Sequence, residues 1–331
     1  MANSSPCSTS TACWAASRCR PTAQLDPTRP ACLPALTRLF GVPHLAALAH
    51  RLDDDDHLSD ADFSKISNLI GQQVGIKLPP GKRLMVEGRL RRRLRALGLT
   101  SFSDYGDYLF RRDGLETEIT YLINAVTTNK TDFFREPEHF ELMQKKLVAE
   151  LIAQRRDRLP LLKVWSAASS TGAEAYTTAM VLADMVSQRR DFRFAVLGTD
   201  ISTDVLETGR RAIYPAEQVM PVPPGMQARY LMQARRPGAR PEVRIVPELR
   251  RLVRFDQLNL MQESYPYDRD VDIILLRNVL IYFEKTDQAK VISRLIGHLR
   301  PGGYLLLGHS ESMIGTSITM RQVAPAVFQK T

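Results

Sequence analysis

The residues best suited to chemistry stand where apolar segments end abruptly in polar side chains. The clearest case is segment 271–276, which stops at Arg277 and Asn278 and is followed shortly by Tyr282. Ligands of open parallel α/β sheets bind beyond the carboxyl ends of the strands. On a helical turn, Asn278 and Tyr282 would be i,i+4 neighbours and would share a face. The pattern predicts a binding site, although a capping Asn and a core Tyr would use the same residue types.

Two earlier segments have the same form. A strand predicted at 161–166 leads into small residues, Gly172 and then Glu174, at a helix start that offers free backbone N–H groups. The segment has neither the G-x-G-x-x-G pattern nor a P-loop lysine, which disfavours a pyrophosphate ligand. A strand predicted at 192–199 ends at Asp200, whose carboxylate suits the two hydroxyls of a ribose. The alternatives are an ordinary strand–helix turn and an Asp200 that only caps the next helix.

Weaker signals come from Asn259 and from the pair Thr131 and Arg135. Asn259 follows a short apolar strand and could face an adenine edge, or it could be a plain loop residue. Thr131 and Arg135 have i,i+4 spacing, so on a helix both would point into one cleft. The Arg135 guanidinium could bind a carboxylate through two parallel hydrogen bonds. The competing interpretation is a surface ion pair of Arg135 with Glu138 or Asp132.

The order of predicted elements indicates the fold class. Strands alternate with helices from residue 137 onward, which is typical of a doubly wound parallel sheet. A Pro-rich insertion interrupts this alternation at 214–241. The predicted main strands are 161–166, 192–199, 271–276 and 303–307, with helices at 137–157, 173–187, 203–212 and 286–299. Segments 243–246 and 252–255 are expected as short strands of the insertion, and 318–323 and 326–329 as antiparallel edge strands.

The segment 57–130 has no strand pattern and predicts four helices. The first begins at an N-cap, Ser59, and ends at Gly75. The second is expected to bury Leu84, Leu90, Leu94 and Leu97 on its apolar face. Lys and Arg dominate from residue 77 to 97, where Glu87 is the single acid. Such a patch favours an acidic partner, although a solvated basic face is the simpler alternative.

The overall composition is that of a folded chain. It has 331 residues, 44% of them hydrophobic and 24% charged, with a net charge of +9. No apolar run approaches the roughly 18–20 residues that cross a bilayer. The four cysteines lie within the first 32 residues, without a C-x2-C pair, so we expect no metal site and a reducing cytoplasm. Residues 1–56 are predicted to be a disordered extension or linker.

Six motifs in order make the chain similar to a known family. They are Thr127-Thr-Asn-Lys-Thr-Asp-Phe-Phe-Arg135, Val164-Trp-Ser-Ala-Ala-Ser-Ser-Thr-Gly172, Thr199-Asp-Ile201, Asn259-Leu260, Arg277-Asn-Val-Leu-Ile-Tyr-Phe283 and Gly308-His-Ser-Glu311. From about residue 58 to the end, the chain resembles the chemotaxis receptor methyltransferases, the CheR family. One departure concerns the Gly-Glu-Glu-Pro-Tyr sequence usual in that family. Here the corresponding residues are Gly172-Ala-Glu-Ala-Tyr176, which keep the second Glu and lose the Pro.

The resemblance implies the architecture. A Rossmann-like S-adenosylmethionine-dependent methyltransferase domain at 131–331, of class α/β, would follow an all-α receptor-docking domain at 57–130. A small β-subdomain would be inserted at 214–256. The family methylates glutamate side chains of membrane chemoreceptors.

The resemblance also implies the site. Arg135 and Tyr282 would be the catalytic residues, with Arg135 on the carboxylate of the cofactor's methionine part and Tyr282 near the transferred methyl group. No metal is implied, and the product would be S-adenosylhomocysteine. The cofactor-binding residues would be Asn129, Thr131, Arg135, Glu174, Asp200, Asn259, Leu260, Arg277 and Asn278.

Expected partners follow from the same resemblance. Acidic methylation helices of receptors would dock on the basic helix, and reversal of Arg91 and Arg93 to Glu would test this. The β-subdomain would be a candidate site for a receptor C-terminal peptide. We expect a cytoplasmic monomer near receptor clusters, with no nucleic-acid partner and no membrane insertion.

Two rival functions stay open at this point. One is a nucleic-acid methyltransferase, which the charge favours and the sequence Arg277-Asn-Val-Leu280 disfavours, because amino-methylating DNA enzymes resemble Asp/Asn-Pro-Pro-Tyr/Phe there. The other is a signalling module that binds the cofactor without turning it over.

Overall fold

The computed structural model describes residues 56–233, 240–313 and 320–331. The predicted extension at 1–56 therefore lies outside the described residues, except for Asp56. The Asp56 carboxylate accepts a hydrogen bond from the Phe102 amide at 2.7 Å, so this residue belongs to the folded part. Among the described residues, no helix is both long enough and apolar enough to span a membrane.

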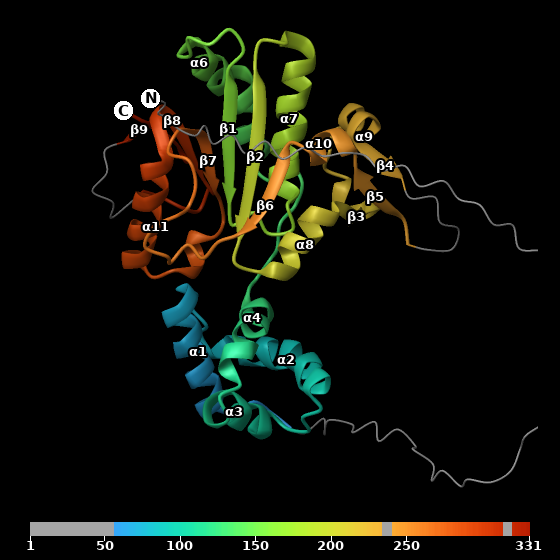
Figure 1. Ribbon diagram of the computed structural model, residues 1–331, viewed down its shortest axis with the longest axis vertical. Coiled ribbons are helices and arrows are strands. Elements are labelled where there is room, and N and C mark those ends of the chain that lie inside the picture. Colours follow the sequence, from blue (N-terminus) through green and yellow to red (C-terminus); the bar gives the residue numbers. More distant parts are fainter. Residues whose placement is uncertain (1–55, 234–239, 314–319) are drawn as a thin grey trace, which may run out of the picture. The chain divides into compact units, whose positions relative to one another are not determined.

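The first part of the described chain is all helical, as predicted (Figure 1). Ser59 caps the first helix by accepting a hydrogen bond from the Asp62 amide, and Gly75 ends it in the left-handed conformation with φ 72°. The helices are α1 Asp60–Val74, α2 Arg83–Leu97, α3 Phe102–Arg111 and α4 Leu115–Val126, with a 3-10 turn Pro80–Lys82 before α2.

One predicted core residue of α2 is wrong. Leu84 is 66% exposed, whereas Val86, Leu90 and Leu94 are buried against the other helices. Residues 86, 90 and 94 recur every fourth position and form one stripe. Leu84 precedes Val86 by two residues, which places it about 200° around the helix from that stripe.

A seven-stranded sheet forms the second part, in the order β6-β2-β1-β7-β8-β10-β9. The first five strands pair in parallel, and β10 pairs with β8 and β9 in antiparallel fashion. The chain runs from β1 outward on one side and later returns on the other, which makes β1 and β7 the point where the order reverses. The strands are β1 Leu161–Ala167, β2 Arg193–Asp200, β6 Val253–Gln257, β7 Val271–Leu276, β8 Leu299–Leu307, β9 Met320–Ala324 and β10 Val327–Lys330.

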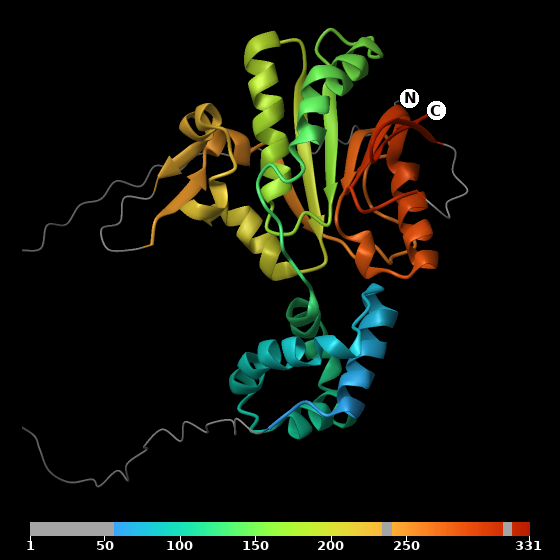
Figure 2. The ribbon, with the colours of Figure 1, turned by 180° about the vertical axis from the view of Figure 1, so that it is seen from behind.

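Helices cover both faces of this sheet, which confirms the Rossmann-like α/β class. Alternate residues of each buried strand point to opposite faces. Val164 and Ile273 pack in the core that includes α7 (Ala173–Arg189), and Trp165 and Ile274 pack in the core that includes α11 (Lys285–His298). Figure 2 shows α7 and the segment α5 Pro137–Leu142, π-turn Met143–Leu147 and α6 Val148–Ala153 in front of the strands.

A separate three-stranded sheet, β3-β5-β4, lies in the insertion after α8 (Thr203–Arg211). The predicted subdomain 214–256 extends too far along the chain, because β6 pairs with β2 in the large sheet. The alternating apolar pattern of β6 would suit an edge strand of either sheet. Sequence periodicity therefore did not show to which sheet β6 belongs. The elements of the insertion are β3 Ile213–Pro215, a 3-10 turn Ala216–Val219, α9 Pro224–Tyr230, β4 Leu231–Gln233, β5 Glu242–Ile245 and α10 Pro247–Arg250.

Candidate functional site

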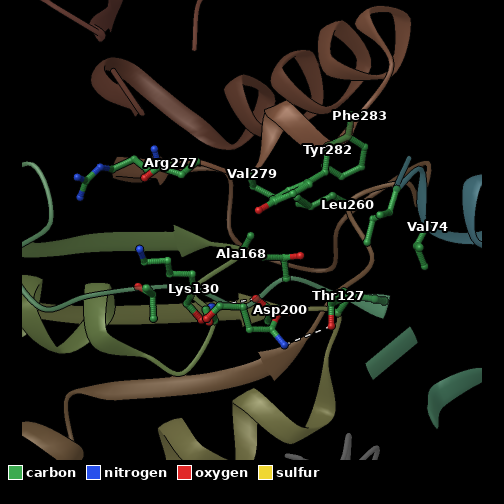
Figure 3. Close-up of a pocket in the computed structure, with 18 of the residues that line it drawn as sticks. Val74, Thr127, Lys130, Ala168, Asp200, Leu260, Arg277, Val279, Tyr282 and Phe283 are labelled. Atoms are coloured by element: carbon green, nitrogen blue, oxygen red, sulfur yellow. Dashed lines mark hydrogen bonds between the residues drawn. The ribbon is translucent and has the colours of Figure 1, made fainter. Parts of the chain in front are cut away.

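A pocket lies at the carboxyl ends of β1, β2, β6 and β7, where the strand order reverses. Figure 3 shows Tyr282, Val279 and Leu260 on one side of Ala168, and Asp200, Lys130 and Thr127 on the other. Every residue predicted for the site lines this pocket. These residues are Asn129, Thr131, Arg135, Glu174, Asp200, Asn259, Leu260, Arg277, Asn278 and Tyr282.

Asp200 is buried at the end of β2 and is held by backbone amides. Its carboxylate accepts hydrogen bonds from the Ser170 amide at 2.9 Å and the Ser202 amide at 3.0 Å. Burial raises the pKa of Asp200, and the two amide hydrogen bonds oppose that rise. The two amides bond to different oxygens, so each oxygen keeps capacity for a further donor. The arrangement suits a ligand with two adjacent hydroxyl groups.

Glu174 forms part of a buried ion network with Arg277 and Glu136. The Arg277 guanidinium donates to Glu174 Oε2 at 3.1 Å and to Glu136 Oε2 at 3.0 Å, and also to the Arg135 carbonyl. Ser166 Oγ donates to the other oxygen of Glu174 at 2.7 Å. Burial raises the pKa of Glu174, whereas the charge of Arg277 lowers it.

The Arg277 side chain serves this network rather than the open part of the pocket. It is 1% exposed, and in Figure 3 it extends away from Tyr282. The Arg277 side chain therefore holds Glu174 in place at the pocket.

The two expected i,i+4 pairs do not lie on helices. Asn278 has a left-handed backbone with φ 58°, and only Leu280–Tyr282 forms a short 3-10 turn. Residues Thr131 and Arg135 are likewise outside any helix, in a stretch where Phe134 and Glu136 have positive φ. Both pairs still reach the pocket, because these tight turns bring their side chains to the same edge of the sheet.

Arg135 has no carboxylate partner among the described residues. Its Nη1 donates to the Lys130 carbonyl at 3.3 Å, so the surface ion pair considered from the sequence, with Glu138 or Asp132, does not form. The guanidinium keeps further N–H donors for an anionic group. Asn129 accepts a hydrogen bond from Ser170 Oγ at its carbonyl, which joins the 127–135 segment to the loop after β1.

Asn259 connects the two parts of the chain. Its Nδ2 donates to the Gln73 carbonyl at 2.7 Å, and its Oδ1 accepts from the Met261 amide at 2.9 Å. Each group has one partner and keeps capacity for a second, because the amide carries two N–H donors and its oxygen two lone pairs. Asn259 also lines the pocket, so its contact with an adenine edge stays a prediction.

The residues that follow α1 pack beside the loops after β6 and β7. The Lys77 amide donates to the Tyr282 carbonyl at 2.9 Å. A Cβ on Gly75 would come within 2.8 Å of Met261 and Phe283, so only glycine fits this approach. The residues that follow α1 therefore form one wall of the pocket.

Sequence reasoning missed several residues that build the site. One is Glu136, which directly follows Arg135 and pairs with the buried Arg277. The available signal was an acid directly beside a predicted site residue. Ser170 belongs to the small-residue run after β1, where the functional role of its amide could not be read from residue type. The wall from the helical part carried no sequence signal, because it depends on how the two parts pack. Its residues are Ile76, Lys77, Leu78, Lys82 and Met85.

Glu136 also belongs to a group with His139 and His309 whose possible ligand atoms lie within 4.8 Å of one another. Two imidazoles and a carboxylate are a ligand set that transition metals accept. The Glu136 oxygens already accept hydrogen bonds from Arg277 at 3.0 Å and Asn278 at 3.2 Å. Burial lowers the pKa of His139 to about 4, so that imidazole is neutral at pH 7.

Comparisons with known proteins agree with this geometry. Residues 61–127 match the family model described as "CheR methyltransferase, all-alpha domain", and residues 129–327 match "CheR methyltransferase, SAM binding domain". The chain is 42% identical over 258 residues to a chemotaxis protein methyltransferase of Escherichia coli, covering 77% of this chain and 85% of that protein. It is 36% identical over 272 residues to chemotaxis protein methyltransferase 2 of Pseudomonas aeruginosa, covering 82% and 94%.

Proposed function

The chain belongs to the CheR methyltransferase family, and we propose that its pocket places S-adenosylmethionine beside a glutamate side chain of a membrane chemoreceptor. It is an S-adenosylmethionine-dependent methyltransferase of chemotaxis. The observation that carries the proposal is the convergence of Asp200, Glu174 and Arg135 on one pocket. These three residues offer two carboxylates and one guanidinium to a ligand that itself has hydroxyl, ammonium and carboxylate groups.

Each charged residue then has one role. Asp200 accepts hydrogen bonds from the ribose hydroxyls through the oxygen capacity that its amide partners leave free. Glu174 accepts from the ammonium group of the methionine part, and Arg135 binds its carboxylate. Asn129, Thr131, Leu260 and Asn278 complete the walls. Asn259 and Arg277 support the pocket by fixing α1 and Glu174, respectively.

The cofactor supplies an electrophilic methyl group when bound. The acceptor is a glutamate whose unperturbed pKa is about 4.3, so the nucleophile is already ionised at pH 7 and needs no general base. The protein's task is to align the two reactants and to exclude water, since attraction between opposite charges is stronger in a dry site. Tyr282, on the opposite side of Ala168 from Asp200 in Figure 3, would orient one reactant.

Calorimetry with S-adenosylhomocysteine tests the binding half of the proposal. We expect saturable heat at one site per chain, strongly weakened in Asp200→Asn and unchanged in Asp204→Asn, an exposed acid in the next helix. Equal affinity of both variants would contradict the assigned role of Asp200. No saturable heat with the unaltered chain would contradict the pocket assignment as a whole.

The helical domain is proposed to dock the acidic receptor helices. Arg91 and Arg93 are poor probes of docking, because Arg91 pairs with buried Glu87 and Arg93 with buried Glu118. Arg92 and Arg95 are exposed on the same helix. The sharper test is therefore Arg92→Glu with Arg95→Glu, which should raise KM for receptor at low salt and leave S-adenosylhomocysteine affinity unchanged. An unchanged KM at low salt would rule out docking there.

The small sheet offers a second contact with the receptor. Its strand β4 is an edge strand, and extended peptides bind such edges by adding a strand. We propose that a receptor C-terminal peptide binds there. A synthetic tail peptide should bind the unaltered chain in calorimetry. Gln233→Pro, a change at an exposed residue of β4, should weaken that binding. Equal binding by the variant would exclude this edge.

The proposal includes a monomer on the cytoplasmic side of the membrane, near receptor clusters. The rival functions make different predictions for one labelled methyl donor. Transfer to oligonucleotides would favour a nucleic-acid methyltransferase, and binding without any transfer would favour a non-catalytic module. Unchanged activity after exhaustive treatment with a chelator would support a reaction without a metal.

A further inference from the structure

The motif Gly308-His-Ser-Glu311 does not line the proposed cofactor pocket. It follows β8, the strand beside β7, whose end carries Arg277 and Asn278. Its last residue, Glu311, is half-buried and turned toward the loop after β7. This carboxylate makes an unusual set of contacts.

Four backbone amides donate to the Glu311 carboxylate. The amides of Val279 and Leu280 donate to Oε1 at 2.8 and 2.7 Å. The amides of Asn278 and Gly308 donate to Oε2, both at 2.8 Å. Hydrogen bonds to an ionised acceptor are stronger than neutral ones, and a carboxylate has about four lone-pair sites. The acceptor capacity of Glu311 is therefore filled by amides of two loops, one after β7 and one after β8, which lie far apart in the sequence.

The loop that Glu311 holds has a shape that residue preferences alone favour only weakly. Asn278 has φ 58°, which non-glycine residues adopt infrequently, although Asn tolerates it better than most. Three consecutive amides, 278 to 280, must point to one place, which requires an abrupt turn directly after β7. A single acceptor opposite that turn supplies the partner that each amide would otherwise lack.

The approach of the two loops also explains Gly308. A Cβ at this position would lie 2.6 Å from Asn278 Nδ2 and 2.9 Å from the Asn278 backbone nitrogen. Glycine at 308 and glutamate at 311 thus act together, one by admitting the loop and the other by binding it. This gives the motif a physical reason.

We propose that Glu311 is a positioning residue for methyl transfer, which acts through the loop from Asn278 to Tyr282. This inference rests on the proposed function of the pocket, since Asn278, Val279 and Tyr282 all line it. Glu311 fixes the end of β7 so that Asn278 faces the pocket and the 3-10 turn presents Tyr282. It touches neither reactant itself.

The test compares Glu311→Gln with Ser310→Ala, a change at an exposed residue of the same motif. Gln keeps the shape but replaces one oxygen with an N–H donor, which leaves two of the four amides facing a donor. We expect kcat to fall about 100-fold, the loss that a misplacement near 1 Å can cause. The melting temperature should change by only a few degrees, and KM for receptor should stay within about twofold. Ser310→Ala should match the unaltered chain.

Glu311→Asp provides the conservative variant. It keeps the charge and both oxygens but is one methylene shorter, so kcat should recover to a value between those of Gln and the unaltered chain. A kcat of Glu311→Gln within twofold of the unaltered chain would overturn the proposal. So would equal losses in Asp and Gln.

Amide hydrogen exchange on the unaltered chain covers the case in which the variants fail to fold. The amides of Val279 and Leu280 should exchange far more slowly than the exposed amides of neighbouring turns. Fast exchange at both would overturn the proposal. This proposal and the proposed function can fail independently. If the unaltered chain does not bind S-adenosylhomocysteine, the pocket assignment is rejected, but the exchange result still stands.

Discussion

Arg277 and Glu174 form an ion pair of 3.1 Å beneath the pocket, and their side chains are only 1% and 13% exposed. Glu136 shares the same guanidinium at 3.0 Å. The two acids come from the loop before α5 and the first turn of α7, and the arginine follows β7. One cation therefore fixes three segments around the site, and each acid depends on it for charge compensation.

Removal of that cation should destabilise the fold. Arg277→Met leaves two acids buried without their partner, and the loss of one member of a buried pair costs about 3–5 kcal/mol. We expect urea unfolding at pH 7 to show a loss of this size. Because Glu174→Gln removes one of the uncompensated charges, the double variant should be more stable than Arg277→Met alone. A double variant that is less stable than both single variants would contradict this account of the network.

Arg93 should contribute to stability and not to docking. Its guanidinium donates two hydrogen bonds to Glu118, whose side chain is 1% exposed. Arg93→Met should destabilise the chain by about 3 kcal/mol in urea unfolding, since it strands the buried acid. Arg92→Met, one residue earlier and exposed, is the matched control and should cost less than about 0.5 kcal/mol. Equal effects of the two changes would mean that the Glu118 pair carries no special weight.

His139 should make the fold sensitive to mild acid. Burial lowers its pKa from 6.5 to about 4, so the unfolded chain takes up a proton before the folded chain does. Stability is therefore complete above about pH 6.5 and is lost as the pH falls toward 4. The slope is about 1.4 kcal/mol per pH unit for one proton, which gives about 2 kcal/mol between pH 6.5 and 5.

Urea unfolding at those two pH values measures this loss. His139→Gln has no group that titrates at this position, so its stability should change little over the same interval. The variant keeps every other titrating group, so the difference between the two proteins reports His139. An unaltered slope in the variant would show that another group causes the acid sensitivity.

Asp200 should determine affinity for the nucleoside part. Asp200→Asn keeps the size but removes the charge and one acceptor, and hydrogen bonds to charged groups contribute about 1.5–3 kcal/mol each. We expect the Kd for S-adenosylhomocysteine to rise by roughly 10- to 150-fold, since 1.4 kcal/mol is a factor of ten. The measurement is calorimetry, with adenine as a ligand that lacks the ribose. Affinity for adenine alone should be similar in both proteins.

The sequence allowed prediction of the parts that depend on local pattern. Buried strands such as 271–276 and the cap residues Ser59 and Gly75 follow from apolar runs and from side-chain and glycine preferences that act within a few residues. The edge of the sheet that carries the site could also be predicted, because polar residues at strand ends mark the carboxyl edge of a parallel sheet. All ten predicted residues consequently meet in one pocket.

Features that depend on contacts far apart in the chain could not be predicted in this way. Helical spacing suggested a shared face for Asn278 and Tyr282, but the Glu311 carboxylate, more than 30 residues away, imposes a turn with positive φ instead. The placement of β6 depends on its partner β2 and not on its own alternation. Asn259 likewise has a role only once α1 lies beside it.

The most direct test of the central claim is transfer of labelled methyl groups from S-adenosylmethionine to chemoreceptor-containing membranes. We predict a base-labile label on a receptor band, as expected for a glutamate methyl ester, and a strong decrease with Arg135→Ala. The label should be absent from receptors whose methylation-helix glutamates are replaced by Ala. Base-stable label, or label on nucleic acid in place of receptor, would contradict the account.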